Sequence, residues 1–151
     1  MRLVSIRGVL VTGLVLTALG SSTTGEGQGL QFFNLTPCRA VDTRNGYGGI
    51  VPVATVRDFQ MKGVCGVPTD AKTVTLNVTA VAPSCSGFLV LYPKGGAFPN
   101  VSNINFNAGE PAIANGAVVP ITTTSPDISL AYGSGAGCTV HVILDVTGYF
   151  K

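Results

Sequence analysis

The feature that most constrains the fold is a run, Thr73–Val81, in which apolar and polar side chains alternate strictly with a period of two. The apolar side chains at positions 74, 76, 78 and 80 lie on one face of an extended chain, and the threonines and the asparagine between them lie on the other. This is the period of a β-strand with one buried face. Because no segment between residues 37 and 150 has helical periodicity, the sequence predicts an all-β protein.

Further strands are predicted from short runs rich in β-branched and aromatic residues between glycine and proline turns. Phe88–Tyr92 is apolar on both faces, which indicates a central strand, and Thr139–Val146 alternates again. The other candidates are Gln31–Leu35, Arg39–Asp42, Val56–Met61, Ser102–Phe106, Ala112–Val119 and Asp127–Tyr132, with Gly133–Gly137 as a hairpin loop. Roughly eight to ten short antiparallel strands at this spacing predict a β-sandwich or jelly roll.

The N-terminus has the pattern of a secretory signal peptide, because Arg2 and Arg7 precede an apolar run, Gly8–Leu19, that ends in small residues. Residues 1–20 are therefore predicted to be removed, although a cut after Ser22 fits nearly as well. The apolar run has about twelve residues against the roughly twenty that a bilayer requires, so we expect no membrane span after cleavage. The mature protein is predicted to be secreted, either extracellular or associated with the cell surface.

After cleavage, residues 21–29 form a polar, glycine-rich leader that is typical of a flexible tether, and residues 30–151 suffice for a single domain. Loss of the first twenty residues removes two of nine basic residues and none of seven acidic ones, which leaves a net charge of zero. We therefore expect no nucleic-acid partner, since such binding requires a clustered basic surface. The charged fraction is 11%, against about 25% in typical soluble domains, so a homo-oligomer that covers part of the surface is a candidate.

Four cysteines, Cys38, Cys65, Cys85 and Cys138, lie in the exported part, and an even number favours two disulfides. Of the three possible pairings we favour Cys38–Cys65, which would tie an opening phrase, Pro37–Arg44, to the turn around Cys65. The remaining pair, Cys85–Cys138, would then clamp the end of a hairpin. A zinc site is disfavoured because no two cysteines are close in sequence and there is one histidine, so no metal or cofactor is expected.

Charged and aromatic residues gather in the opening phrase and in a closing phrase, Leu144–Phe150. We predict a structural clasp, in which a charge-assisted hydrogen-bond set pins the first strand to the loop Asn45–Gly49. In the closing phrase, Asp145 is expected to accept hydrogen bonds from backbone or hydroxyl groups while the terminal aromatic rings pack. The predicted clasp consists of Arg39, Asp42, Arg44, Asp145 and Tyr149. The alternative is a shallow sugar-binding edge that includes Asn45 and Tyr47.

A second candidate region is the asparagine-rich segment from Phe98 to Asn107. Its asparagines are expected mainly to bond loop backbone, and the alternative is a polar binding patch with Phe98 and Pro99 as its apolar floor. The candidate ligand-binding residues are Asn45, Tyr47, Phe98, Asn103, Asn105 and Asn107.

Catalytic patterns are missing from the sequence, which contains no Gly-x-Ser-x-Gly elbow. His141 lies four residues before Asp145 on the same strand face, about 13 Å away at the rise of a strand, which is too far for a catalytic pair. We therefore predict that the protein is not an enzyme, with a small secreted hydrolase as the least favoured alternative.

Several short motifs together resemble a module found in many secreted bacterial proteins, alone, in tandem or appended to exported enzymes such as peptidases. They are Pro-Cys-Arg-x-x-Asp-Thr-Arg at 37–44, Cys-Gly-x-Pro at 65–68, Asn-Val-Thr at 77–79, Gly-Phe-Leu-x-x-Tyr-Pro at 87–93, Ser-Asn-x-Asn-Phe at 102–106, Ala-Asn at 114–115 and Asp-Val-x-Gly-Tyr-Phe at 145–150. The resemblance implies a β-sandwich at the cell exterior, and no activity is established for the module.

Two functional hypotheses follow from the sequence. The favoured one is a non-catalytic extracellular module for surface attachment or recognition, with glycans or cell-envelope components as the expected ligands. The other is a structural subunit that self-associates into an extracellular oligomer or surface layer, which the low charge and the positive mean hydropathy of +0.45 support.

Overall fold

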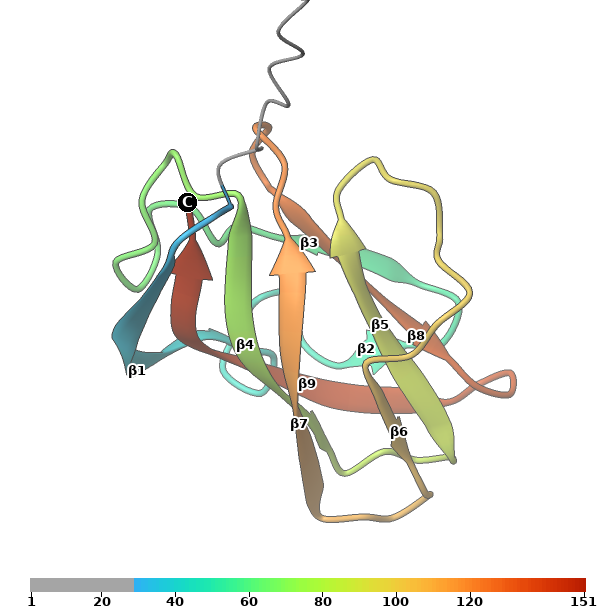
Figure 1. Cartoon of the computed structure of the whole chain (residues 1–151). Coiled ribbons are helices and arrows are strands. Elements are labelled where there is room, and N and C mark those ends of the chain that lie inside the picture. The colour runs from blue at the N-terminus through green and yellow to red at the C-terminus, as the bar shows by residue number, and fades with distance from the viewer. Residues whose placement is uncertain (1–28) are drawn as a thin grey trace, which may run out of the picture.

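Nine strands form over residues 29–151, the part of the chain that the computed structural model describes, and no helix occurs in this part (Figure 1). The predicted signal peptide, residues 1–20, and all of the predicted leader except Gly29 lie outside the described residues. Backbone pairing begins at Gln31, whose N–H donates to the carbonyl of Lys151 at 2.8 Å. Both ends of the described chain therefore lie side by side at one edge of the fold.

The strands form two antiparallel sheets. The first sheet has the order β1 (Phe32–Asp42), β9 (Thr139–Phe150), β4 (Thr73–Val81) and β7 (Ala112–Pro120), with the short β2 (Val51–Pro52) also paired to β9. The second has the order β3 (Val56–Phe59), β8 (Ile128–Gly133), β5 (Gly87–Pro93) and β6 (Ile104–Phe106). This arrangement confirms the predicted all-β sandwich.

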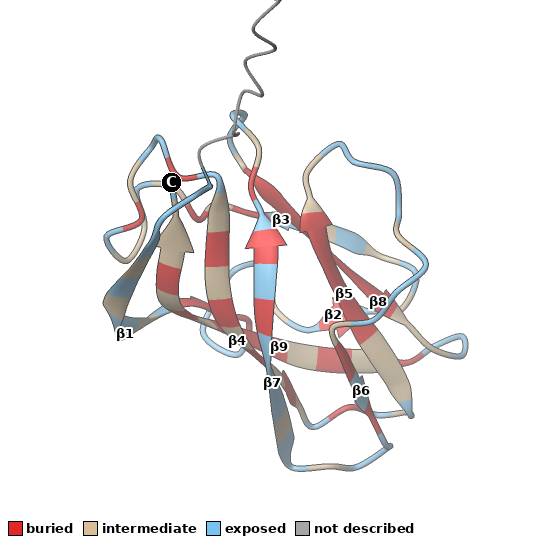
Figure 2. Cartoon of the chain, in the orientation of Figure 1, coloured by how far each residue is buried: buried red, intermediate tan, exposed pale blue. Residues whose placement is uncertain are grey.

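The core lies between the sheets. The alternation predicted for Thr73–Val81 is confirmed, since the four apolar side chains of this run are buried and the residues between them are half-buried (Figure 2). From the other sheet, Leu89, Leu91 and Leu130 are buried against the same cluster. Complete burial of a side chain of this size contributes about 1.5–3 kcal/mol, so this two-sided packing is the main stabilising term. β5 lies between β8 and β6, which confirms its predicted central position.

Several strand boundaries differ from the prediction. The predicted strands Gln31–Leu35 and Arg39–Asp42 form one continuous strand, β1. Its pairing with β9 shifts register twice, once before Arg39 and once after it. β9 continues to Phe150 rather than ending at residue 146, because β1 and β4 both supply pairing partners along that stretch. β3 ends at Phe59, since the backbone N–H groups of Met61 and Lys62 donate instead to the Asp127 carboxylate, at 2.9 and 2.8 Å.

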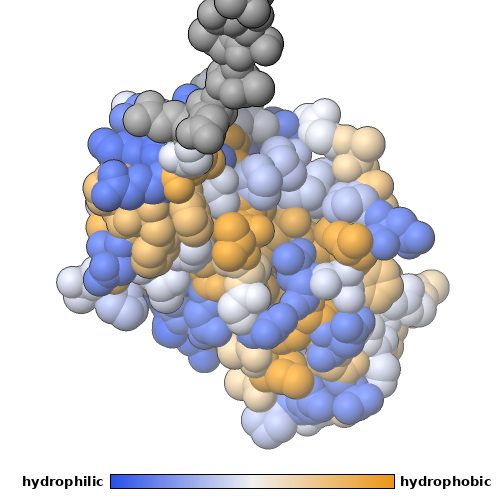
Figure 3. Space-filling view, in the orientation of Figure 1, coloured by the Kyte–Doolittle hydropathy of each residue, from blue (hydrophilic) through white to orange (hydrophobic). Residues whose placement is uncertain are grey.

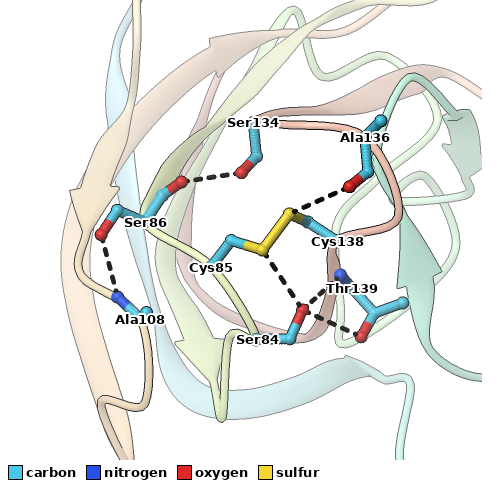
Figure 4. The surroundings of a disulfide bond; sticks show 8 residues. All are labelled: Ser84, Cys85, Ser86, Ala108, Ser134, Ala136, Cys138 and Thr139. Atoms are coloured by element: carbon cyan, nitrogen blue, oxygen red, sulfur yellow. Dashed lines mark hydrogen bonds between the residues drawn. A yellow bond between two sulfur atoms is a disulfide. The ribbon is translucent and has the colours of Figure 1, made fainter.

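Both predicted disulfides are confirmed, Cys38–Cys65 and Cys85–Cys138. The expected role of the second is wrong, because β8 and β9 belong to different sheets and Gly133–Gly137 is therefore a crossing between sheets rather than a hairpin loop. Cys85–Cys138 joins this crossing to the β4–β5 crossing and closes one end of the sandwich (Figure 4). Around it, the Thr139 N–H donates to the Ser84 hydroxyl at 2.8 Å and the Ser134 hydroxyl donates to the Ser86 carbonyl at 2.7 Å.

Disulfides of this kind are typical of proteins that fold in an oxidising compartment. Within residues 29–151 the structure contains no helix with the length and apolar character needed to cross a membrane.

Candidate functional site

Asp42 is the centre of the clasp. Its carboxylate accepts hydrogen bonds from the Arg44 guanidinium at 2.8 and 2.6 Å, from the Arg44 backbone N–H at 3.1 Å and from the Asn45 amide at 3.3 Å. The bonds from the Arg44 side chain lower the pKa of Asp42 to about 2, because they favour the ionised form more than desolvation disfavours it. Asn45, a candidate ligand residue, is thus engaged in the clasp.

Arg39 connects Asp42 to the closing phrase. Its guanidinium donates two hydrogen bonds to Asp145, at 2.9 and 3.2 Å, and lies 3.6 Å from the Asp42 carboxylate. The hydrogen bond to Asp145 is the main cause of the raised pKa of Arg39. The expected role of Asp145 as an acceptor for backbone or hydroxyl groups is therefore wrong, because Arg39 lies directly opposite it in the β1–β9 register.

Tyr149 strengthens the same junction through its ring rather than through its hydroxyl. The ring stacks on Phe33 of β1, with centroids 5.1 Å apart and planes 13° from parallel, and Phe150 packs on Phe32 at 5.0 Å. The closing phrase is thus joined to the opening phrase by the Arg39–Asp145 ion pair and to the start of β1 by aromatic packing.

The loop Asn45–Gly49 is held by Arg57, a residue that the sequence analysis missed. From β3, the Arg57 guanidinium donates to the carbonyls of Tyr47 at 3.2 Å, of Gly49, and of Ile50 at 3.1 Å. A single arginine in a short strand carries no local signal for such contacts. The Tyr47 side chain is exposed, but it lines none of the surface hollows described below.

His141 is held by Thr43. The imidazole Nδ1 lies 3.1 Å from the Thr43 hydroxyl, which also accepts a hydrogen bond from the Val142 N–H at 2.8 Å. Because Thr43 is buried, this set fastens the end of β1 to β9. These contacts fit a structural histidine.

A surface hollow of about 310 Å³, here called the Phe88 hollow, lies on the outer side of the second sheet. It is lined by Phe88, Phe98, Pro99, Asn100, Val101, Ser102 and Asn105. Phe88 of β5 and Asn105 of β6 are direct partners in the sheet and so project from the same face. The loop that carries Phe98 folds back over this face, where the Phe98 ring contacts Tyr92 edge-on, with centroids 5.9 Å apart.

Phe88 is held in place by Gly133, its partner on β8. A Cβ atom added at Gly133 would lie 2.2 Å from the Phe88 ring, so the ring rests directly on the glycine backbone. Covering a strand glycine with an aromatic ring from the neighbouring strand fixes the ring and protects the backbone. The floor of the hollow is therefore a rigid aromatic surface.

The candidate ligand residues lie in different places, although Asn103 and Asn105 both line a third hollow, of about 390 Å³, between β6 and β7. Phe98 and Asn105 line the Phe88 hollow together, and the Asn105 amide donates to Ser102 at 2.9 Å. Asn103 is structural, since its side-chain oxygen accepts the Leu91 N–H at 2.6 Å, and Asn107 donates to Glu110 at 3.0 Å.

Sequence reasoning missed Phe88 as a lining residue. It looked like an ordinary core position, and only the strand register places its ring over Gly133 and beside Asn105.

A second hollow, of about 510 Å³, lies over the clasp and is lined by Pro37, Cys38, Arg39, Asn77, Asp145 and Thr147. Its two charged side chains, Arg39 and Asp145, are hydrogen-bonded to each other. Within residues 29–151 no three His, Cys, Asp or Glu side chains are close enough to hold a metal ion.

The fold and these contacts define a disulfide-stapled β-sandwich with a shallow hollow of aromatic and amide side chains on one outer face. No family model, curated protein or solved structure matches the chain.

Proposed function

We propose that the protein is a non-catalytic, secreted module for recognition at the cell surface, and that glycans or other hydroxyl-rich cell-envelope components bind in the Phe88 hollow. The observation that carries the proposal is the rigid Phe88 ring on Gly133 beside the exposed Phe98, which has 57% of its surface accessible. Burial of this aromatic surface against a ligand is favourable, and Phe88 and Phe98 present it within one hollow.

The polar lining supports a hydroxyl-rich ligand. Sugar rings present apolar C–H faces that pack on aromatic rings and hydroxyls that pair with planar amides, and the hollow offers both kinds of group in Phe88, Phe98, Asn100 and Asn105. None of the residues that line it is charged, so the ligand is expected to be neutral at the point of contact. With about 310 Å³ the hollow is at the small end of ligand sites, which fits one terminal unit rather than a long chain.

Secretion is supported by two features that stand apart from the hollow. The N-terminal run has the pattern of a signal peptide, and the two disulfides form stably only in an oxidising environment.

The proposal is tested by measuring binding of the disulfide-bonded protein to an array of glycans and cell-wall fragments, followed by titration calorimetry with any ligand found. Phe98→Ala is expected to weaken binding about tenfold, which corresponds to roughly 1.4 kcal/mol of lost aromatic contact. Since Phe98 is largely exposed, the midpoint of thermal unfolding should change little.

Tyr47→Ala is the matched control, because Tyr47 is an equally exposed aromatic residue outside the hollow, and it should bind as the unaltered protein does. A wild-type protein that binds nothing on the array, or a Phe98→Ala variant with unchanged affinity, would overturn the proposal.

A further inference from the structure

In the described part of the chain the two sheets end in four strands, β1, β7, β3 and β6, while the two-residue β2 pairs with β9 beyond the end of β1. Natural proteins block such edges with charge, irregular register or short length, because unpaired backbone groups attract further strands. β3 has four residues and carries Arg57 and Asp58, and β6 has three residues. β1 has two register shifts and the Arg39 side chain. Three of the four edges are thus protected.

β7 lacks these three protections, and its one side-chain contact towards β6 is the Asn115 amide, which donates to the Asn103 carbonyl at 2.7 Å. The strand pairs with β4 over nine consecutive residues without a register shift and contains no charged side chain. At its outer positions Ala112, Ala114, Gly116 and Val118 are all exposed, and Val118 keeps 63% of its surface accessible. Apolar side chains, interleaved with polar ones, are visible along the course of β7 in the space-filling view (Figure 3). Pro120 limits pairing only at the end of the strand.

The direction of the backbone groups along β7 follows from the bonds at its two ends. The Ile121 N–H donates to the Lys72 carbonyl at 2.9 Å, and the Ala82 N–H donates to the Pro111 carbonyl at 3.2 Å. Because hydrogen-bonding direction alternates along an antiparallel strand, the odd-numbered residues of β7 bond to β4 and the even-numbered ones point outward. The N–H and C=O groups of Ala112, Ala114, Gly116 and Val118 therefore face the open edge.

We propose that this edge binds the same edge of a second copy of the chain. The two β7 strands would run antiparallel about a twofold axis at Gly116, so that the first sheets of both subunits form one continuous sheet. In this register Gly116 pairs with Gly116 of the partner subunit, and Val118 with the partner subunit's Ala114. About eight hydrogen bonds would join the chains. The proposal is independent of ligand recognition in the Phe88 hollow.

A second copy fits this edge because the edge is complementary to itself. About a twofold axis, each outward N–H of β7 donates to an outward carbonyl of the partner subunit's β7. No like charges meet, since β7 contains no charged side chain. The side chains that come together are small, so the strands can approach to the usual spacing of about 4.8 Å. Strand pairing alone buries less area than a permanent interface, so the expected dissociation constant is on the order of micromolar.

Sedimentation velocity over about a hundredfold range of concentration around this value tests the proposal. The disulfide-bonded protein should change from monomer to dimer across the range and go no further. Val118→Lys places a charge two residues from the proposed twofold axis and should remain a monomer with an unchanged melting temperature, because the side chain is solvent-exposed. Val56→Lys, at an equally exposed valine of β3, is the matched control and should form dimers as the unaltered protein does.

Amide hydrogen exchange gives a test that requires no variant. The amides of Ala114, Gly116 and Val118 should become protected as the protein concentration rises, whereas those of Ala117 and Val119 are protected by β4 at every concentration.

Three results would overturn the proposal: a strict monomer, dimers of Val118→Lys, or exchange at the outward-facing amides that does not depend on concentration. Open-ended assembly would also overturn it, since a twofold contact closes on itself. Phe98→Ala should form dimers normally, so failure of the binding proposal is distinguishable from failure of this one.

Discussion

The Asp42 carboxylate contacts Arg39, Arg44 and Asn45 at once. It orients Arg44 through the side chain and the backbone at once and, together with Asp145, holds Arg39 between two acidic groups. These contacts fix the direction of the chain at the end of β1. Its members are engaged with one another, which is why we place ligand binding at the Phe88 hollow rather than at the clasp.

Asp42→Asn is expected to lower the thermal midpoint at pH 7, because the amide retains the shape of the carboxylate but loses its charge-assisted hydrogen bonds. The pKa of Asp42 is about 2 in the folded protein, below its ordinary value of about 4 in an unfolded chain. Its contribution to stability is therefore fully present above about pH 4 and is lost as the pH falls towards 2. Melting curves of both proteins across this window should converge at the acid end.

Asp70→Asn is a suitable control, since the Asp70 side chain is 63% exposed and its ion pair within residues 29–151 is with the C-terminal Lys151, at 3.5 Å. It should melt as the unaltered protein does at every pH. If the difference in thermal midpoint between Asp42→Asn and the unaltered protein stayed constant down to pH 2, the stabilisation would not depend on ionisation of Asp42.

At the scale of elements, the contact between β5 and β8 decides the shape of the Phe88 hollow. Gly133→Ala should displace the Phe88 ring, because the added Cβ would lie 2.2 Å from the ring and the end of a side chain can move where backbone cannot. We expect a loss of about 1–3 kcal/mol in the free energy of unfolding, together with weaker ligand binding. Urea unfolding and aromatic NMR signals of Phe88 measure the two effects.

Gly135→Ala is the matched control in the same crossing. Its added Cβ would meet the Cys138 Sγ at 3.9 Å, which is an ordinary contact, so its stability and Phe88 signals should stay near those of the unaltered protein. Unchanged Phe88 signals in Gly133→Ala would show that the glycine does not position the ring.

Local patterns predicted the elements well where one face of a strand is buried. In Thr73–Val81 the apolar side chains all lie on the buried face and the polar ones on the other face, so the alternation in the sequence predicts directly which residues are buried. The Gly133–Gly137 segment was misinterpreted for the converse reason: a glycine-rich turn looks the same whether the next strand joins the same sheet or the opposite one. The positions of Arg57 under its loop and of Phe88 over Gly133 depend on pairings between distant segments, which no local pattern encodes.

At the scale of the whole molecule, stability rests on two sources, the core between the sheets and the two disulfides. The disulfides close loops with sequence separations of 27 and 53 residues. By the chain-entropy relation these loops correspond to about 3.5 and about 4 kcal/mol. Their sum is comparable to the entire stability of a typical domain, about 5–15 kcal/mol. We therefore expect the stability of the folded state to depend on the redox state of its surroundings.

Full reduction of both disulfides should lower the melting temperature by roughly 20–30 °C, at about 4 °C per kcal/mol for a domain of this size. Circular dichroism with and without a phosphine reductant measures the shift, and thiol counting confirms that both bonds are broken. A loss of this size would fit a protein that works in an oxidising compartment, where its disulfides persist. A protein that melts at the same temperature after confirmed reduction would show instead that the core suffices, and the disulfides would no longer support an extracellular role.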